Sequence, residues 1–284
     1  MRIETDVQRV IVVVLDGLRP DAIERFGLNH IRRLMATGAH SCAATTVNPS
    51  VTAAAMTSLV SGVHPARHGI QSDRLFIPRT ATGLTPIPEV LARNGLPSSA
   101  FMADVAPIFR GFATRVGRRL GFNVLKTAGK TSPEILHAAR ATLRIQQHGL
   151  ILFHWPDADH AGHDHGWMSD AYAEGCARMD DTLGMLSVIA NVAHDPGTIL
   201  IALADHGGGG VNAKDHESDH PLDRTIPLLI AGRDVVPTEL ATPHLVDVPP
   251  SILWALGLEV PASYEGRVLH EAFATFDTAA SAVA

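Results

Sequence analysis

Four short apolar runs punctuate the chain, and each of them lies beside Asp or His residues. The runs cover residues 10–15, 149–155, 198–204 and 225–231. Short runs that are rich in β-branched residues and bounded by Gly, Pro or Asp are typical of buried strands in a parallel sheet. In open α/β sheets, ligands bind in the crevice beyond the carboxyl ends of the strands. The pattern therefore predicts a parallel sheet with a polar site at one edge.

Helical periodicity alternates with these runs, which is the pattern of βαβ units. We expect helices over 21–37, 52–60, 87–94, 133–147, 171–192 and 249–256, and a further strand over 98–102. The range 171–192 is the most clearly amphipathic, and we interpret its Asp180-Asp181 pair as a solvated helix face. The predicted fold class is α/β, a three-layer α/β/α sandwich around a central, mostly parallel sheet.

One domain over 1–284 is expected, because neither a repeat nor a linker interrupts the pattern. The range 105–131 mixes Phe with Arg and Lys, and two interpretations stay open. It is either a basic surface loop or a lid that closes over an anionic substrate. The range 271–284 is rich in Ala and Ser, and we expect it to fray.

The charge and the histidine content narrow the class of protein. A net charge of −6 and a pI near 6.2 argue against a nucleic-acid polymer or an anionic membrane as partner. We see no apolar secretory segment at the N-terminus and no run long enough to span a bilayer, so a cytoplasmic location is expected. Most of the 16 His are expected to be solvated or core residues. A His is therefore treated as a ligand only where its neighbours and its strand context support that role.

Three Asp and three His meet that condition, because they flank the apolar runs. They are Asp16, Asp159, His163, Asp205, His206 and His216. Asp159 and His163 are four residues apart, so one helical turn can present both to one ion. Asp157 competes for the role of Asp159, but its spacing to His163 fits less well. The convergence of these residues at one sheet edge predicts a site for two metal ions.

Thr52 is the candidate nucleophile. It stands where a helix is expected to begin, so its hydroxyl would lie near free N–H groups and the positive end of the helix. A divalent ion can activate such a hydroxyl without a histidine base. The alternative is that Thr52 only caps the helix, as Thr commonly does. The expected proximity of Asp16, Asp205 and His206 favours the nucleophile.

Six colinear blocks make the chain resemble the alkaline phosphatase superfamily. Within it, the chain most resembles the type I phosphodiesterases/nucleotide pyrophosphatases and the phosphonoacetate hydrolases. The blocks are LDGLRPD (15–21), the segment from PSVT to HGI (49–70), DHAGHDHG (159–166), ADHGG (204–208), HESDHPLDRTIPLLIAG (216–232) and the segment 246–269. The resemblance implies an alkaline-phosphatase-like fold. Long cap insertions of some relatives are absent, so we expect a minimal cap.

The resemblance also implies the ligand sets. One ion would be held by Asp159, His163 and His216, and the other by Asp16, Asp205 and His206 with Thr52 Oγ1 as a further ligand. Oxygen and nitrogen ligands of this kind suit two divalent ions, with Zn²⁺ expected and Mn²⁺ as the alternative.

Asp73 is a departure from the family pattern. Pyrophosphatase-type relatives often place an Asn after the HGI turn, where it holds a phosphoryl oxygen, whereas this chain has Gln71-Ser72-Asp73. A carboxylate there would repel that oxygen unless it is protonated or turned away. Arg74, or backbone amides near Thr52, could take over the contact. Asp73 and Arg74 are therefore the candidate substrate-binding residues.

The expected function is metal-dependent hydrolysis of a small anionic phosphoester, of the phosphodiester, nucleotide pyrophosphate or phosphonate type, with Thr52 as nucleophile. Phosphonoacetate hydrolysis at a C–P bond and phosphomonoesterase activity are the alternatives within the superfamily. A catalytically silent, metal-binding family member is the alternative outside the enzymes. A conventional sulfatase is not expected, because neither Cys42 nor Cys176 lies in the motif C/S-x-P-x-R.

Overall fold

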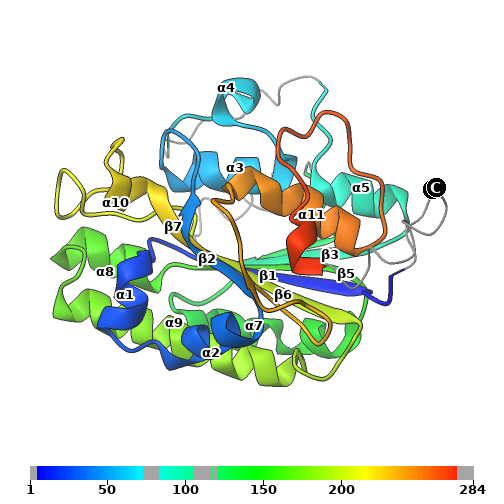
Figure 1. The fold of residues 1–284 in the computed structure, drawn as a ribbon, viewed down its shortest axis with the longest axis horizontal. Coiled ribbons are helices and arrows are strands. Elements are labelled where there is room, and N and C mark those ends of the chain that lie inside the picture. Colours follow the sequence, from blue (N-terminus) through cyan, green and yellow to red (C-terminus); the bar gives the residue numbers. More distant parts are fainter. Residues whose placement is uncertain (1–4, 73–82, 105–116, 118–119, 274–284) are drawn as a thin grey trace.

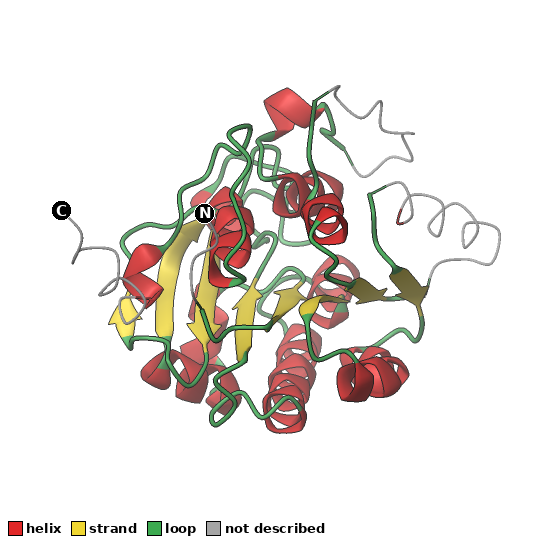
Figure 2. Cartoon of the chain, turned by 90° about the vertical axis from the view of Figure 1, so that its right-hand side faces the viewer, coloured by secondary structure: helices red, strands yellow, loops and turns green. Residues whose placement is uncertain are grey.

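The computed structural model of the chain describes residues 5–72, 83–104, 117 and 120–273. A central sheet of eight strands separates two layers of helices, so the predicted α/β sandwich is confirmed (Figures 1 and 2). The strands are β1 (Arg9–Leu15), β2 (Ala39–Thr45), β3 (Ser98–Met102), β4 (Val124–Thr127), β5 (Gly149–Trp155), β6 (Thr198–Leu203), β7 (Thr225–Ala231) and β8 (Thr238–Glu239). Their order across the sheet is β4-β3-β5-β1-β6-β7-β2-β8.

The sheet is mostly parallel, as predicted, but one predicted direction is wrong. Among the described strands five pairings are parallel, and the two that involve β7 are antiparallel. The run 225–231 therefore forms a strand that opposes its neighbours. Thr225 at the start of β7 pairs with Thr45 at the end of β2. The start of β7 thus lies at the same sheet edge as the carboxyl ends of the other strands.

One layer of helices covers the face of the sheet drawn lower in Figure 1. It contains α1 (Pro20–Arg25), α2 (Asn29–Thr37), α7 (Ser132–Ile145), α8 (Asp157–His165) and α9 (Asp170–Ile189). The opposite layer contains α3 (Thr52–Ser61), α4 (Pro65–His68), α5 (Ile87–Arg93) and α11 (Val248–Ala255). Two short helices, α10 (Pro221–Arg224) and η1 (Leu245–Asp247), lie in connections. None of the described helices is both long and apolar enough to cross a membrane.

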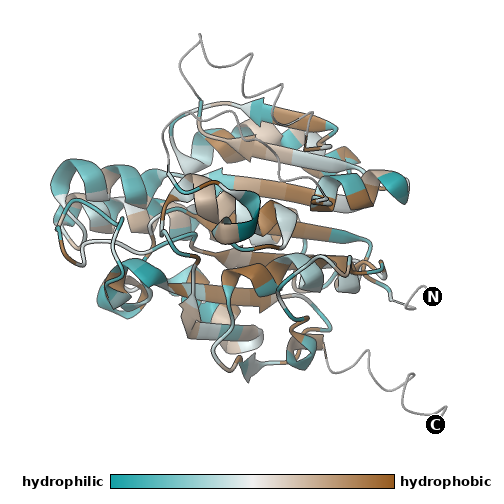
Figure 3. Ribbon diagram, turned by 90° about the horizontal axis from the view of Figure 1, so that it is seen from above, coloured by the Kyte–Doolittle hydropathy of each residue, from teal (hydrophilic) through white to brown (hydrophobic). Residues whose placement is uncertain are grey.

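The core lies along β1, β5 and β6. Every residue of β1 is buried, and 10–14 are 0% exposed, because helices cover both faces of these strands. The strands accordingly form an apolar centre between more polar outer helices (Figure 3). Arg9 at the start of β1 is also buried, and its guanidinium donates to the carbonyl oxygens of Leu143, Gln146 and Ala190. Arg9 thereby ties the carboxyl ends of α7 and α9 to the amino end of the sheet.

Two details of the predicted helices are wrong. The range 21–37 is two helices, α1 and α2, separated by a turn in which Gly27 has a φ of +62°. Asp180 is not solvated, because it is 5% exposed and accepts hydrogen bonds from the backbone N–H groups of His30 and Ile31. These N–H groups lie in the first turn of α2 and have no partner within the helix. The side chain of Asp181, at 75% exposed, fits the solvated interpretation.

The two segments with open interpretations are described only in part. Within 105–131, Val124–Thr127 forms β4 at the sheet edge and pairs in parallel with β3, so this stretch is not a lid. Residues 105–116, 118 and 119 lie outside the described residues, and both interpretations of that part stay predictions. Of the expected tail 271–284, Ala272 and Phe273 are 0% exposed, so fraying is wrong for them. Residues 274–284 lie outside the described part.

Candidate metal centre

Five segments bring the predicted site residues to the carboxyl edge of the sheet. Asp16 follows β1, α8 follows β5, and Asp205 and His206 follow β6. The loop that holds His216 leads into α10 and β7, and Thr52 begins α3 after β2. The antiparallel direction of β7 explains the position of His216, because a residue before this strand reaches the edge that other strands reach at their ends. In Figure 1 this edge lies near α8 and α10.

The centre of the site contains three buried carboxylates. Asp16, Asp159 and Asp205 are 4%, 7% and 1% exposed. Nε2 of His206 lies between them, 3.2 Å from Asp16 Oδ1, 3.7 Å from Asp205 Oδ2 and 4.0 Å from Asp159 Oδ1. Backbone N–H groups of Gly17 and His206 donate to Asp205 Oδ1, which leaves Oδ2 facing the centre. Charged groups this deeply buried need compensating positive charge.

The pKa values of Asp16 and Asp205 are shifted because charged groups lie so close together. Burial, and then the charges of Asp159 and Asp205, raise the pKa of Asp16 to about 8. Burial alone would also raise the pKa of Asp205, but the charges of His206 and His154 outweigh it and hold that pKa low. Asp16 therefore stays protonated near neutral pH unless a further cation balances its charge.

Several ligand atoms at the centre have no hydrogen-bond partner within the described structure. They are Asp16 Oδ1, Asp159 Oδ1, Asp205 Oδ2 and His154 Nε2. Two groups of three residues each place their ligand atoms within 4.8 Å of one another: Asp159 with His206 and His216, and Asp16 with His154 and Asp205. Unsatisfied carboxylate and imidazole atoms gathered in this way fit divalent ions such as Zn²⁺ or Mn²⁺.

Three histidines are oriented in the same way. Nδ1 of His163, His206 and His216 lies 3.0, 2.9 and 2.7 Å from the carbonyl oxygens of Lys214, Gly207 and Ser50, respectively. A carbonyl oxygen only accepts, so each Nδ1 carries a proton, and Nε2 is the nitrogen of each ring that is left to bind a metal ion once it has lost its own proton. The three Nε2 atoms lie 3.3, 4.0 and 3.8 Å from Asp159 Oδ1. Backbone hydrogen bonds thus prepare all three rings as ligands.

Thr52 is the first residue of α3, and the structure contradicts the capping alternative. Val51 occupies the N-cap position, and no side-chain hydrogen bond caps this helix. Instead, Thr52 Oγ1 lies 3.1 Å from His206 Nε2. The hydroxyl therefore faces the cluster of carboxylates and imidazoles.

Asp157 has a structural role, which settles its competition with Asp159. Its two carboxylate oxygens accept hydrogen bonds from Arg178 Nε and from the backbone N–H of Ser132, both at 2.8 Å. It links the start of α8 to α7 and α9 and does not face the centre. Asp73 and Arg74 lie outside the described residues.

Two residues at the centre were not predicted from the sequence. His154, inside the apolar run 149–155, lies 3.3 Å from Asp16 Oδ2 through its Nε2 atom. Trp167 packs its ring edge-on against His163 and His216 and donates from Nε1 to the carbonyl oxygen of Gly17 at 2.9 Å. The position of His154 near a strand end was an available signal, whereas nothing in the sequence marked Trp167.

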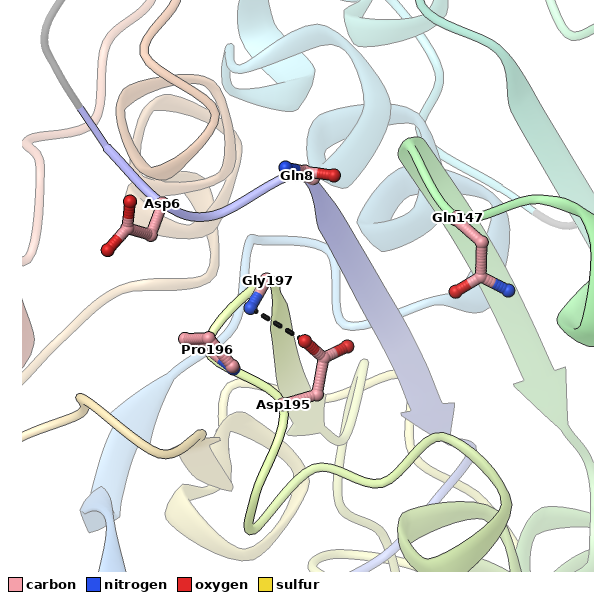
Figure 4. Close-up of a pocket in the computed structure, with 6 residues that line it drawn as sticks. All are labelled: Asp6, Gln8, Gln147, Asp195, Pro196 and Gly197. Carbon is pink, nitrogen blue, oxygen red and sulfur yellow. Dashed lines mark hydrogen bonds between the residues drawn. The ribbon is translucent and has the colours of Figure 1, made fainter.

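A shallow hollow lies at the opposite end of the sheet (Figure 4). It is lined by Asp6, Gln8, Gln147, Asp195, Pro196 and Gly197. These residues precede β1, β5 and β6, so the hollow lies at the amino ends of the strands. It is therefore separate from the metal centre, and the side chain of Asp195 within it already accepts a hydrogen bond from the Gly197 N–H.

Most of the chain matches one known protein family. Residues 10–229 match the family described as type I phosphodiesterase / nucleotide pyrophosphatase. The 2,3-bisphosphoglycerate-independent phosphoglycerate mutase of Colwellia psychrerythraea is 29% identical over 128 residues, which are 43% of this chain and 23% of that protein. The catalytic subunit of human GPI ethanolamine phosphate transferase 3 is 24% identical over 225 residues, which are 76% of this chain and 19% of that protein. The matches thus span less than a quarter of either relative.

Solved structures share the fold at low sequence identity. Murine ectonucleotide pyrophosphatase/phosphodiesterase 5, in an inactive variant with AMP bound, has a TM-score of 0.68 and 15% identity, and the match covers 91% of this chain and 97% of that one. The lipoteichoic acid synthase LtaP of Listeria monocytogenes has a TM-score of 0.70 and 14% identity over 95% of this chain and 76% of that one. A 2-O GAG sulfatase has a TM-score of 0.71 and 13% identity over 95% and 74%.

Proposed function

Because the chain belongs to the type I phosphodiesterase / nucleotide pyrophosphatase family, we propose that it is a metal-dependent phosphodiester or pyrophosphate hydrolase with Thr52 as nucleophile. The observation that carries this proposal is the position of Thr52 Oγ1. It stands at the start of α3, 3.1 Å from His206 Nε2. It thus adjoins the three buried carboxylates that His206 Nε2 contacts.

The ligand sets proposed are Asp159, His163 and His216 for one divalent ion, and Asp16, Asp205 and His206 with Thr52 for the other. His206 Nε2 is closer to Asp16 than to Asp159, which supports its assignment to the second set. Two bound ions would neutralise the carboxylates, favour the alkoxide of Thr52 and polarise the phosphoryl oxygens. Zn²⁺ is the proposed metal, with Mn²⁺ as the alternative.

The reaction proposed has two displacements. Thr52 Oγ1 attacks phosphorus in line, the new Thr52–phosphorus bond forms, and the bond to the leaving alcohol or phosphate breaks. Water then cleaves the phosphothreonine and returns the hydroxyl to Thr52. The start of α3 favours the first step, because the free N–H groups of the helix point toward the anionic phosphoryl group.

Features of the relatives support the choice of a nucleotide ester or another small anionic phosphoester as substrate. The inactive variant of the murine neighbour that was solved with AMP carries alanine in place of a threonine. The names of the curated relatives include a mutase and a phosphate transferase, which indicates transfer of a phosphate group rather than its release alone. Transfer to an added alcohol is therefore the second activity to measure.

A substrate panel tests the proposal. Purified protein with Zn²⁺ or Mn²⁺ should hydrolyse bis-p-nitrophenyl phosphate or a nucleotide pyrophosphate faster than p-nitrophenyl phosphate. Faster cleavage of p-nitrophenyl phosphate would favour a phosphomonoesterase, and release of phosphate from phosphonoacetate would favour C–P hydrolysis. Metal binding without turnover of any substrate, including a phosphonate monoester, would indicate the silent, metal-binding alternative.

A further inference from the structure

His154 lies beside the metal centre because of its register in the sheet. It is the penultimate residue of β5 and pairs with Val14 of β1, which also pairs with Leu203 of β6. Asp16 and Asp205 follow Val14 and Leu203 by two residues. The three polar side chains therefore come from the carboxyl ends of three neighbouring strands.

The contacts of His154 are those of a ligand rather than of a core residue. Its Nε2 atom lies 3.3 Å from Asp16 Oδ2 and 3.8 Å from Asp205 Oδ2. The side chain is 13% exposed, and Nε2 has no hydrogen-bond partner among the described residues. Asp205 Oδ2, which faces it, has no hydrogen-bond partner there either. A buried imidazole nitrogen and a buried carboxylate oxygen that both lack a partner point to something between them.

The separation of 3.3 Å is informative, because it exceeds the roughly 2.7–2.9 Å of a charge-assisted N–H···O⁻ bond. Two ligand atoms about 2.0–2.1 Å from one ion in tetrahedral geometry lie roughly 3.4 Å apart. The pair is therefore spaced as two ligands of one ion rather than as a donor and an acceptor.

We propose that His154 is an additional protein ligand of the ion held by Asp16 and Asp205. This inference rests on the two-ion centre of the proposed function and adds to it a residue outside the ligand sets given above. His154 would complete an Asp–Asp–His set, while His206 Nε2, 3.2 Å from Asp16 Oδ1, stands between this set and the one that contains Asp159.

The test measures metal binding rather than turnover. Protein stripped of metal is titrated with Zn²⁺ against a competing chromophoric chelator, for wild type, His154→Gln and His154→Ala. Both variants should keep one ion at wild-type affinity and lose about 100-fold or more in affinity for the other, beyond the roughly 10–100-fold effect of outer-shell partners. His148→Ala is the matched control, because this exposed residue precedes the amino end of the same strand. Cooperative thermal unfolding of each metal-free variant checks that it folds.

A spectroscopic readout separates a ligand from a positioning residue. With saturating Co²⁺, proton NMR of wild type should show hyperfine-shifted imidazole N–H resonances, and His154→Gln should show one fewer. Unchanged Zn²⁺ affinity in the His154 variants would overturn the inference, and so would weaker binding with the same number of shifted resonances. Failure of the proposed function looks different: wild-type protein that binds two ions without turnover leaves this inference standing, whereas wild-type protein that binds fewer than two ions overturns both.

Discussion

The imidazole rings of His206 and His216 stack face to face, with centroids 3.7 Å apart and ring planes 7° from parallel. Two imidazolium ions at this distance would repel each other, so the stack tolerates at most one charge. Burial, and then the charge of His206, lower the pKa of His216. At most one of the two rings is therefore charged in the metal-free protein, and the lowered pKa of His216 favours the neutral form that metal ligation requires.

Metal binding should release protons and should weaken as the pH falls. The contact with Asp159 raises the pKa of His163 to about 9, and burial with neighbouring carboxylates raises that of Asp16 to about 8. Below these values both groups are protonated in the metal-free protein, so a metal ion must displace the protons. Zn²⁺ affinity should rise from pH 6 to pH 9. Calorimetry at pH 7 in buffers of different ionisation enthalpy should detect the released protons, and binding without proton release would contradict the expectation.

Removal of the metal should abolish activity, and Zn²⁺ or Mn²⁺ should restore it. The two ligand sets predict two ions per chain, because the carboxylates of Asp16, Asp159 and Asp205 crowd together and the raised pKa of Asp16 shows that a further cation is needed to ionise all three. Elemental analysis after treatment with EDTA and reconstitution measures the stoichiometry. A fully active protein that holds one ion or none would rule out the paired mechanism.

Thr52→Ala should lower kcat by roughly 10³-fold or more, because it removes the attacking oxygen. Thr52→Ser should keep part of the activity, since it retains a hydroxyl at the same position. Thr57→Ala is the matched control on α3, because the Thr57 hydroxyl donates to the carbonyl oxygen of Ala53 within the helix. The measurement is kcat of each variant on the diester that the wild-type protein hydrolyses fastest. Near-normal turnover by Thr52→Ala would exclude this residue as nucleophile.

Asp157 and Asp159 should respond in opposite ways to replacement by Asn. Asp157→Asn weakens hydrogen bonds to Arg178 and to the Ser132 N–H, so the free energy of unfolding should fall by about 2 kcal/mol while metal binding persists. Asp159→Asn removes a carboxylate whose Oδ1 atom faces the Nε2 atoms of His163, His206 and His216, so it should impair metal binding far more than Asp157→Asn does. Urea unfolding and Zn²⁺ titration of both variants provide the comparison. Equal loss of metal binding in both would contradict the separation of roles.

Trp167→Phe should lower metal affinity by about 10-fold while the fold is kept, because Trp167 orients the rings of His163 and His216. Tyr172 still donates to the carbonyl oxygen of Gly17 in the variant, so that group stays satisfied. Trp167 should also report metal binding through its fluorescence. The fluorescence change on adding Zn²⁺ should disappear in Trp167→Phe and persist in Trp254→Phe, and its persistence in the first variant would refute the assignment.

The central part of this fold could be predicted from the sequence because its signals are local. The runs that form β1, β5 and β6 are apolar throughout, and the helical ranges that became α7 and α9 have clear periodicity. The direction of β7 could not be predicted in this way, because a fully buried strand has the same composition whether it runs parallel or antiparallel. β2 and β4 also escaped prediction, since their mixed polar and apolar residues carry no clear alternation.

The sequence could predict that the candidate site residues lie close together, because each of them flanks a strand or begins a helix. The structure brings together Thr52, Asp16, Asp205, His206, Asp159, His163 and His216, although their roles stay predictions. His154 was missed because an imidazole inside an apolar run has the sequence signature of a core residue. Only the register of β5 against β1 reveals which way it points. The burial of Asp180 was missed for a similar reason, since its partners belong to α2, about 150 residues earlier in the chain.

Because β7 runs antiparallel to β6, the connection between them can change in length without altering the sheet. A parallel strand in this place would require a crossover that carries the chain back to the other end of the sheet. Here residues 204–224 connect the end of β6 to the start of β7 at the same edge of the sheet. This single connection supplies Asp205, His206 and His216. Insertions or deletions between the two histidines would respace them without shifting the register of any strand. New substrate preferences could therefore evolve, or be engineered, in the connection between β6 and β7 while the strands and helices that position Asp16 and Asp159 remain unchanged.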